Sequence, residues 1–423
     1  MAPLKVLISG AGIAGNALAF WLSHQQHDVT VVERFPDLRS FGLQIDIRGH
    51  GIEVLKRMGL ESAFRTVSVK EQGLEFVNRN GKAIAYFPAN KTGEGLQSFT
   101  TDYEIMRGDL IRLLYDNVKD RVRYVFGTTI EDFEQLDDSV EVRLSNGHKD
   151  RYDLLIGADG QWSRTRKQML GPRAEDPIHF LGVYAGYFTI PCQIKNEETY
   201  NGTAYIAPGQ RLLFTRRHKP DRIQAYLVGL TDSERMMAAR KVGVEEEKAV
   251  LSELFRSAGW RSEELVKELQ ESDDFYCEHM GVVRLDSWSD GRVALLGDAA
   301  YAPTATTGMG TTSSLVGAYV LAGEIQNHFV RSDTSKEALL EALHTYEQHF
   351  RPFMDSVQHG IKRDETYWHK MPSGSFTLAC LNHFLSLVSF FRLDVLAKYI
   401  MREDIGSWKL PDYEGMDLRQ DKK

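Results

Sequence analysis

Residues 4–15 read LKVLISGAGIAG, an apolar run that leads into the glycine spacing GxGxxG. The run has the composition of a buried parallel strand. In nucleotide-binding loops of this spacing, Gly10 makes a tight turn, Gly12 lets the backbone approach a pyrophosphate, and Gly15 allows close helix–strand packing. Taken alone the spacing is a weak signal, because ordinary glycine turns also show it.

The residues that follow complete a β-α-β unit. Apolar residues recur at helical spacing from Ile13 and Ala14 onward, and the start of such a helix offers free N–H groups and a positive dipole end to phosphates. A second apolar strand, 29–32, ends in Glu33, an acid placed to accept ribose hydroxyls. With strand, helix and acid in register, the sequence predicts a Rossmann-type dinucleotide site in an α/β fold. This unit alone does not distinguish FAD from NAD.

Two later motifs lie at the ends of predicted strands. Residues 153–166 read DLLIGADGQWSRTR, a strand that leads into a Gly-Ala-Asp-Gly turn around Asp159. Residues 291–303 read GRVALLGDAAYAP, in which Asp298 ends a strand and suits contact with a ribityl hydroxyl. A long helix, 312–329, follows, and its N-terminus would stabilise negative charge on a reduced flavin.

These three motifs, in this order and spacing over about residues 4–330, resemble those of the flavin-dependent aromatic hydroxylases, the group-A monooxygenases with the p-hydroxybenzoate hydroxylase fold. The resemblance implies that the glycine loop binds FAD. It also implies that Glu33 binds the adenosine ribose, that Arg34 lies along the adenine, and that Asp298 binds the flavin side. Asp159 belongs to the motif that serves both FAD and NAD(P)H in the family. The implied cofactor-binding residues are Gly10, Gly12, Ile13, Ala14, Gly15, Glu33, Arg34, Gln44, Asp46, Arg107, Asp159, Asp298, Pro303, Gly308, Met309 and Gly310.

Several of these residues take their role from the resemblance alone. Pro303 and residues 308–310 match the segment that passes the isoalloxazine ring. Arg107, in MRGDL, matches the arginine that reaches the FAD pyrophosphate. Residues 44–48, QIDIR, match a segment beside the flavin, and similar enzymes that inactivate tetracyclines have an acid at the position of Asp46.

One position departs from the family pattern. Tyr301 stands where many members have His after Asp-Ala-Ala, and we expect it to alter a local hydrogen bond without removing FAD binding. Outside the motif context, Arg48, Arg107 and Arg166 would be interpreted as surface arginines, because arginine is seldom fully buried.

The resemblance also implies a reaction. NADPH or NADH docks transiently and reduces FAD, in keeping with the lack of a second GxGxxG. A C4a-hydroperoxyflavin formed with O2 then transfers one oxygen atom to an aromatic, polyketide-like or polycyclic small molecule. The residues identify no catalytic side chain. The alternatives are a flavin-dependent reductase or dehydrogenase, or a Baeyer–Villiger-type oxygenase, on the same scaffold.

Between the second and third motifs the sequence favours antiparallel strands. In the strand predicted for 180–190, Tyr187 and Phe188 must face opposite sides, because neighbours on a regular strand alternate. The dipeptide Asn80-Gly81 predicts a hairpin over 74–87. Further strands are predicted at 204–207, 211–215 and 223–230, and helices at 51–60, 109–118, 244–258 and 262–270.

The predicted nucleotide domain is therefore discontinuous. Residues 376–391 are strongly apolar but include Asn382 and His383, so we expect a buried helix that covers the core rather than a membrane span. In tetracycline-inactivating relatives such a C-terminal segment braces the two domains. The predicted division is an FAD-binding domain of 1–73, 100–172 and 282–331, a substrate domain of 74–99 and 173–281, and a C-terminal helical segment of 332–423.

Composition narrows the range of partners. The 423 residues carry a net charge of −8, which argues against nucleic acid as a partner. The basic run 216–219 (RRHK) is interpreted as a solvated turn. Three scattered cysteines suit a reducing cytoplasm, and the histidines show no HxH or HExxH, so no metal site is predicted. We expect a cytoplasmic monomer or homodimer that takes a small aromatic substrate and O2, without stable membrane insertion.

Overall fold

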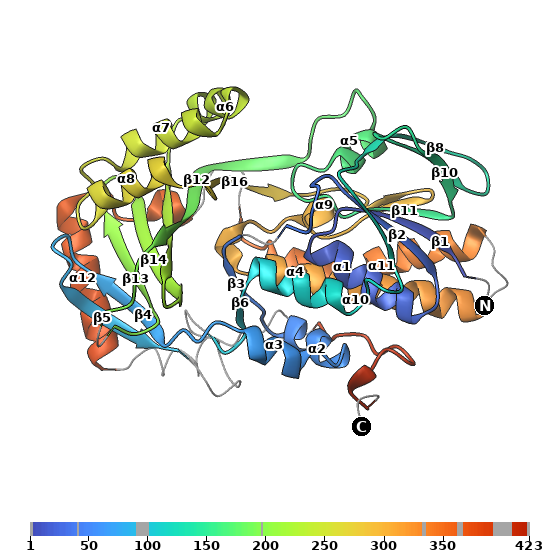
Figure 1. The fold of residues 1–423 in the computed structure, drawn as a ribbon, viewed down its shortest axis with the longest axis horizontal. Helices are drawn as coiled ribbons and strands as arrows, with labels where there is room; N and C mark the ends of the chain where they lie inside the picture. Colours follow the sequence, from blue (N-terminus) through green and yellow to red (C-terminus); the bar gives the residue numbers. More distant parts are fainter. Residues whose placement is uncertain are drawn as a thin grey trace.

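The computed structural model describes residues 3–39, 42–89, 101–195, 198–331, 336–361, 367–391 and 408–420. Parts of two predicted segments, 90–99 in the substrate domain and 392–407 in the C-terminal segment, lie outside the described residues. Two lobes, each built on a large sheet, lie side by side in Figure 1. The predicted α/β fold is confirmed.

The first lobe is built on a six-stranded, mostly parallel sheet in the order β17-β18-β11-β1-β2-β7. β1 lies between β2 and β11 and pairs parallel with both, as the β-α-β pattern predicts. The apolar strands are buried on both faces, which is typical of a parallel sheet. The strands are β1 (Lys5–Ser9), β2 (Asp28–Glu33), β7 (Arg123–Phe126), β11 (Leu154–Gly157), β17 (Ser289–Asp290) and β18 (Val293–Leu295).

Helices cover one face of this sheet and a small antiparallel sheet covers the other. α1 (Ile13–His24) packs between α10 (Gly310–Arg331) and α4 (Arg107–Asp116) in the largest apolar core. Leu7 and Val32 pack on the opposite face, against the three-stranded sheet. That sheet contains β8 (Ile130–Gln135), β9 (Val140–Leu144) and β10 (Lys149–Tyr152).

The second lobe is built on a seven-stranded sheet in the order β16-β12-β15-β14-β13-β4-β5. The predicted hairpin is confirmed as β4 and β5, which extend this sheet through a parallel pair with β13. β12 and β16 are long enough to run back toward the first lobe (Figure 1). The strands are β4 (Gly73–Val77), β5 (Ala83–Pro88), β12 (Ile178–Pro191), β13 (Asn201–Ala207), β14 (Arg211–Lys219), β15 (Arg222–Leu230) and β16 (Tyr276–Val283).

Three helices cover the outer face of the seven-stranded sheet. Phe188 packs into the core beneath them, whereas Tyr187 faces the other side of β12, so the predicted alternation is confirmed. Because the inner face carries several aromatic side chains, it can contribute a wall to a cavity between the lobes. The helices are α6 (Ser233–Val242), α7 (Val244–Phe255) and α8 (Ser262–Glu271).

The C-terminal part adds helices to both lobes. α11 (Lys336–Val357) packs against α10, while α12 (Ser375–Phe390) lies on β5 at the far edge of the second lobe (Figure 1). Residues 408–420 return to the first lobe, beside α2 (His50–Arg57) and α10. The helices predicted at 51–60, 109–118, 244–258 and 262–270 are confirmed as α2, α4, α7 and α8.

Two expectations were wrong. Residues 376–391 form a helix, but they do not form a buried one: Phe376 is 81% exposed and Phe390 is 78% exposed, because α12 packs through one face only, on β5. Residues 216–219 are not a turn but the end of β14, and Arg216 and Arg217 are held by internal partners. No helix among the described residues has the length and apolarity needed to span a membrane.

Candidate active site

A cavity of about 400 Å³ lies between the two lobes. The glycine loop and the start of α10 form its first-lobe side, and the inner face of the seven-stranded sheet forms the opposite wall. Of the sixteen predicted cofactor-binding residues, ten line it: Gly12, Ile13, Ala14, Gln44, Asp46, Arg107, Asp298, Pro303, Gly308 and Gly310.

The glycine loop has the shape that its spacing predicts. Gly10 has φ +108°, and a Cβ there would lie 2.5 Å from the carbonyl oxygen of Ala158. A Cβ on Gly15 would lie 2.0 Å from the carbonyl oxygen of Gly10, so only glycine allows α1 to approach so closely. At Gly12, by contrast, a Cβ would meet nothing within 4 Å, because this glycine faces the cavity. The loop therefore leaves room for a bulky group directly in front of the N-terminus of α1.

Glu33 lies at the end of β2 and supports the glycine loop. Its carboxylate accepts hydrogen bonds from the backbone N–H of Ala11 at 2.8 Å and of Phe35 at 3.1 Å. Arg34 is exposed and lies over the ring of Phe35, with its guanidinium carbon 4.8 Å from the ring centroid. Within the described part of the chain, the residues that line the cavity include neither Glu33 nor Arg34. Their predicted roles toward adenosine therefore stay predictions.

Asp159 caps a helix. One carboxylate oxygen accepts from the Ser163 hydroxyl, and the other accepts from the backbone N–H groups of Arg164 and Thr165 at the start of α5 (Arg164–Leu170). Arg166, in the same helix, is fully buried and is not a surface arginine. It donates to the carbonyl oxygens of Gln161 and Ala299 and thereby ties the second motif to the third.

Charged side chains gather around Asp298, at the start of α9 (Asp298–Tyr301). Burial raises the pKa of Asp298, against the opposing effect of Arg107. Glu278, from β16, faces the same cavity, and burial and the charge of Asp298 raise its pKa as well. The Tyr187 hydroxyl donates to Glu278 at 3.2 Å. The cavity thus holds two acids whose pKa values are raised, with Arg107 beside them.

The segment before α10 is a strained loop. Thr304 has φ +68°, a conformation that is uncommon for a residue with a side chain. Thr304 lines the cavity, and its buried hydroxyl oxygen has no hydrogen-bond partner among the described residues. Gly308 and Gly310 line the cavity, whereas Met309 packs against the apolar core. The loop and the first turn of α10 therefore present backbone and a free hydroxyl to a ligand.

Tyr301 is buried beneath this loop. Its hydroxyl lies 3.2 Å from that of Tyr346, and a Cβ on Gly317 would lie 2.0 Å from it. The local hydrogen bond at this position is thus made inside the core of the first lobe.

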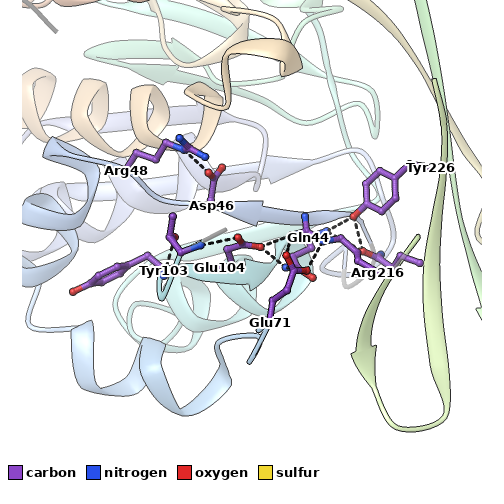
Figure 2. A network of polar contacts seen from close by, with 10 residues as sticks. Gln44, Asp46, Arg48, Glu71, Tyr103, Glu104, Arg216 and Tyr226 are labelled. Carbon is purple, nitrogen blue, oxygen red and sulfur yellow. Dashed lines mark hydrogen bonds and ion pairs between the residues drawn. The ribbon is translucent and has the colours of Figure 1, made fainter. Parts of the chain in front are cut away.

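Gln44, in β3 (Gln44–Asp46), was predicted as a cofactor-binding residue, but its polar neighbours in the cavity were not predicted. Arg216, in β14, and Tyr226 line the cavity together with Gln44. Figure 2 shows Arg216 and Gln44 meeting two buried acids, Glu71 and Glu104. No motif contains these acids, and the basic run around Arg216 concealed its strand. Only the alternation of β14 beyond residue 215 could have placed Arg216 on an inner face.

Comparison with known proteins decides the family. A family model described as an FAD binding domain matches residues 3–359. The chain is 50% identical over 424 residues to the FAD-dependent monooxygenase asL4 of Sarocladium schorii, and the match covers 98% of this chain and 99% of the relative. The chain belongs to the FAD-dependent monooxygenases. It is also 43% identical to the flavin-dependent monooxygenase eupH of a Phoma species, over 84% of this chain and 85% of that one.

Solved structures agree with this assignment. The monooxygenase superposes on the tetracycline destructase Tet(55) with a TM-score of 0.74 and 27% identity, over 97% of this chain and 99% of that one. The tetracycline destructase Tet(51) gives the same values. The predicted family is therefore confirmed, and the enzyme is an FAD-binding oxidoreductase.

The cavity residues fit FAD. Gly12 leaves space before the N-terminus of α1, where a pyrophosphate would be stabilised by free N–H groups. Arg107 adds a positive charge, and the unpartnered hydroxyl of Thr304 offers a hydrogen bond at the far end. The donors that a dinucleotide requires are thus present along one cavity wall of this monooxygenase.

Proposed function

We propose that this monooxygenase uses NAD(P)H and O2 to hydroxylate an aromatic, polyketide-like or polycyclic small molecule. One observation carries the proposal: the cavity that begins at Gly12 ends against an aromatic wall. Tyr187, Phe214, Tyr226 and Trp368 line that wall. Flat apolar rings bind well against such side chains, and a few polar groups then fix their orientation.

The names of similar proteins support a polycyclic substrate. Tet(55) is called a tetracycline destructase, and it shares 27% identity and nearly the whole length with this chain. Tetracyclines are polycyclic molecules that carry several hydroxyl groups. A fused-ring substrate with acidic hydroxyls is therefore the class that we propose here.

Bound FAD supplies the redox chemistry: two electrons from NAD(P)H and one O2 yield one oxygen atom in the product and one water. The chain would hold the dinucleotide by its pyrophosphate, at Gly12 and Arg107, and by its ribityl chain, at Asp298. The N-terminus of α10 would face negative charge on the flavin side.

The test is a panel of phenols, hydroxylated polyketides and fused-ring aromatics offered to the purified holoenzyme. We expect at least one compound to stimulate NAD(P)H oxidation and to gain the mass of one oxygen atom. Turnover of the same compound with NAD(P)H under strict anaerobic conditions would contradict the proposal. We further propose a cytoplasmic location, which agrees with three free cysteines.

A further inference from the structure

Two buried acids share one arginine beside the cavity. Arg216 donates to both carboxylate oxygens of Glu71 at 2.8 Å and also donates to Glu104. The side-chain amide of Gln44 donates to Glu71 at 3.2 Å and, in a shorter contact, to Glu104. Figure 2 shows that the four side chains converge, with Tyr226 next to them. We call Gln44, Glu71, Glu104 and Arg216 the carboxyl–arginine network.

The network connects two cavities. A second cavity of about 290 Å³ is lined by Gln44, Asp46, Arg48, Glu104 and Arg216 together with residues 305–308. Gln44 and Arg216 line the main cavity as well. Within the described part of the chain, Glu104 lines the second cavity and does not line the main one. A proton that reaches Glu104 therefore has a polar compartment on its far side.

Gln44 has an unused acceptor. Its Nε2 donates to two carboxylates. The reverse orientation of the amide would place its carbonyl oxygen, an acceptor, against those acceptors, so the orientation of the amide is fixed. Its Oε1 is buried without a partner among the described residues. A buried acceptor without a partner is costly, which indicates that a donor from a bound ligand completes it.

The charges of the network do not balance. With both acids ionised, Glu71 and Glu104 face one guanidinium and leave a net charge of −1. Burial raises the pKa of Glu104 to about 7; Glu71 and Asp46 act in the same direction, while Arg216 and Gln44 oppose them. Arg48 pairs with Asp46, and the Tyr226 hydroxyl donates to Gln224. Glu104 is therefore the member of the network most ready to accept a proton.

We propose that the carboxyl–arginine network is the subsite for an acidic hydroxyl of the substrate, a phenol or an enol, and that Glu104 takes up its proton. This inference rests on the proposed function. The substrate O–H bond breaks, and the proton moves through water to a carboxylate oxygen of Glu104, which does not line the main cavity. Arg216 then has one carboxylate partner fewer and faces the new phenolate. The total charge of network and substrate stays the same.

The proposed step assigns roles that differ among the residues. Arg216 touches the substrate oxygen, and Gln44 accepts from its hydroxyl before the proton moves. Glu104 acts as a proton-holding residue behind them, and Glu71 keeps Arg216 in place through two hydrogen bonds. A phenolate donates more electron density to its ring than a phenol does, which favours transfer of an electrophilic oxygen atom to that ring.

The test measures protons on the oxidised holoenzyme, without NAD(P)H. A panel of phenols that are neutral in solution at the assay pH is titrated next to the matching methyl ethers. Difference absorbance reports phenolate formed, and calorimetry in two buffers reports protons released. At about pH 8 we expect wild type to form phenolate with almost no proton release, because Glu104 accepts the proton. Glu104→Gln, which preserves shape, should release about one proton for each phenolate formed.

Three further variants serve as controls for this measurement. Arg216→Met should bind phenols and ethers alike, without phenolate. Arg222→Met, on the exposed end of the adjacent strand, should behave as wild type. Glu278→Gln tests an acid that lines the main cavity, as Glu104 does not. The inference would be overturned if wild type and Glu104→Gln released equal numbers of protons, or if Glu278→Gln changed the proton release instead. It would also be overturned if the phenols bound only in their neutral form or did not bind. Product mass from turnover, measured on the same preparations, tests the proposed function separately.

Discussion

Arg216 donates from Nε to one oxygen of Glu71 and from Nη2 to the other, both at 2.8 Å. The side chain of Glu71 is 0% exposed and that of Arg216 is 12% exposed. A buried ion pair contributes little net stability, because desolvation opposes the attraction. Removal of one partner, however, leaves a buried charge without compensation, and this asymmetry makes the pair testable.

We expect Arg216→Met to lower the free energy of unfolding at neutral pH by about 3–5 kcal/mol, because two buried acids lose their counterion. The loss should shrink at about pH 5, where Glu104 is protonated. Urea denaturation measures both values. Arg143→Met is the control: its pair with Asp132 is about half exposed on each side, so its loss should change stability little. Equal losses in the two variants would contradict this account of the network.

Glu104 should shape the dependence of stability on pH. Its pKa is raised from 4.5 to about 7 in the fold, so the stability that its neutral form contributes is complete below 4.5 and is lost as pH rises through about 7. The free energy of unfolding of wild type should therefore fall from about pH 5 to pH 8 more steeply than that of Glu104→Gln. Denaturation at intervals over that range measures the two slopes, and parallel slopes would show that Glu104 is ionised throughout.

Gly12→Val should yield a folded but colourless protein. A Cβ at Gly12 meets nothing within 4 Å, so the polypeptide accommodates the side chain, which then occupies the space before α1. Flavin absorbance and the thermal midpoint, compared with wild-type apoprotein, measure the two effects. Gly374→Val is the matched control, because Gly374 precedes α12 in an ordinary extended conformation and does not line the cavity. A bright yellow Gly12→Val protein would place the dinucleotide elsewhere.

The C-terminal residues should stabilise the first lobe. Tyr413 is buried, donates to Glu324, and packs so closely that a Cβ on Gly323 would lie 2.2 Å from its ring. Tyr413→Ala should cost about 3–5 kcal/mol. Phe376→Ala, at a position 81% exposed on α12, should change stability by less than about 0.5 kcal/mol. Chemical denaturation compares the two, and a small loss at Tyr413 would show that residues 408–420 are dispensable for stability.

The sequence predicted those parts of the molecule that local rules govern. Gly10 and Gly15 are required by contacts within one β-α-β unit, so their spacing reveals the turn. The Asn80-Gly81 hairpin and the alternation of Tyr187 and Phe188 likewise depend on neighbours in the chain. Such features are encoded over a few residues and are read without knowledge of the whole fold.

The carboxyl–arginine network could not be predicted in this way. Glu71 precedes β4, Glu104 begins β6 (Glu104–Met106) and Arg216 lies in β14, and only the packing of these three distant segments brings them together. Arg216 in RRHK has the composition of a turn, because the acids that neutralise it lie more than a hundred residues away. The prediction that residues 376–391 form a buried helix was wrong for a related reason. An apolar sequence does not show how many faces of its helix are covered by the rest of the fold.

The central claim is that this chain inserts one atom of O2 into an aromatic substrate at the cavity between its lobes. The most direct measurement is the mass of the product formed by the holoenzyme with NAD(P)H under oxygen-18 gas, for the panel compound that best stimulates NAD(P)H oxidation. We predict a product that carries a single oxygen-18 atom and no product when Gly12→Val replaces wild type. A product that carries oxygen from water, or that forms without O2, would contradict the claim.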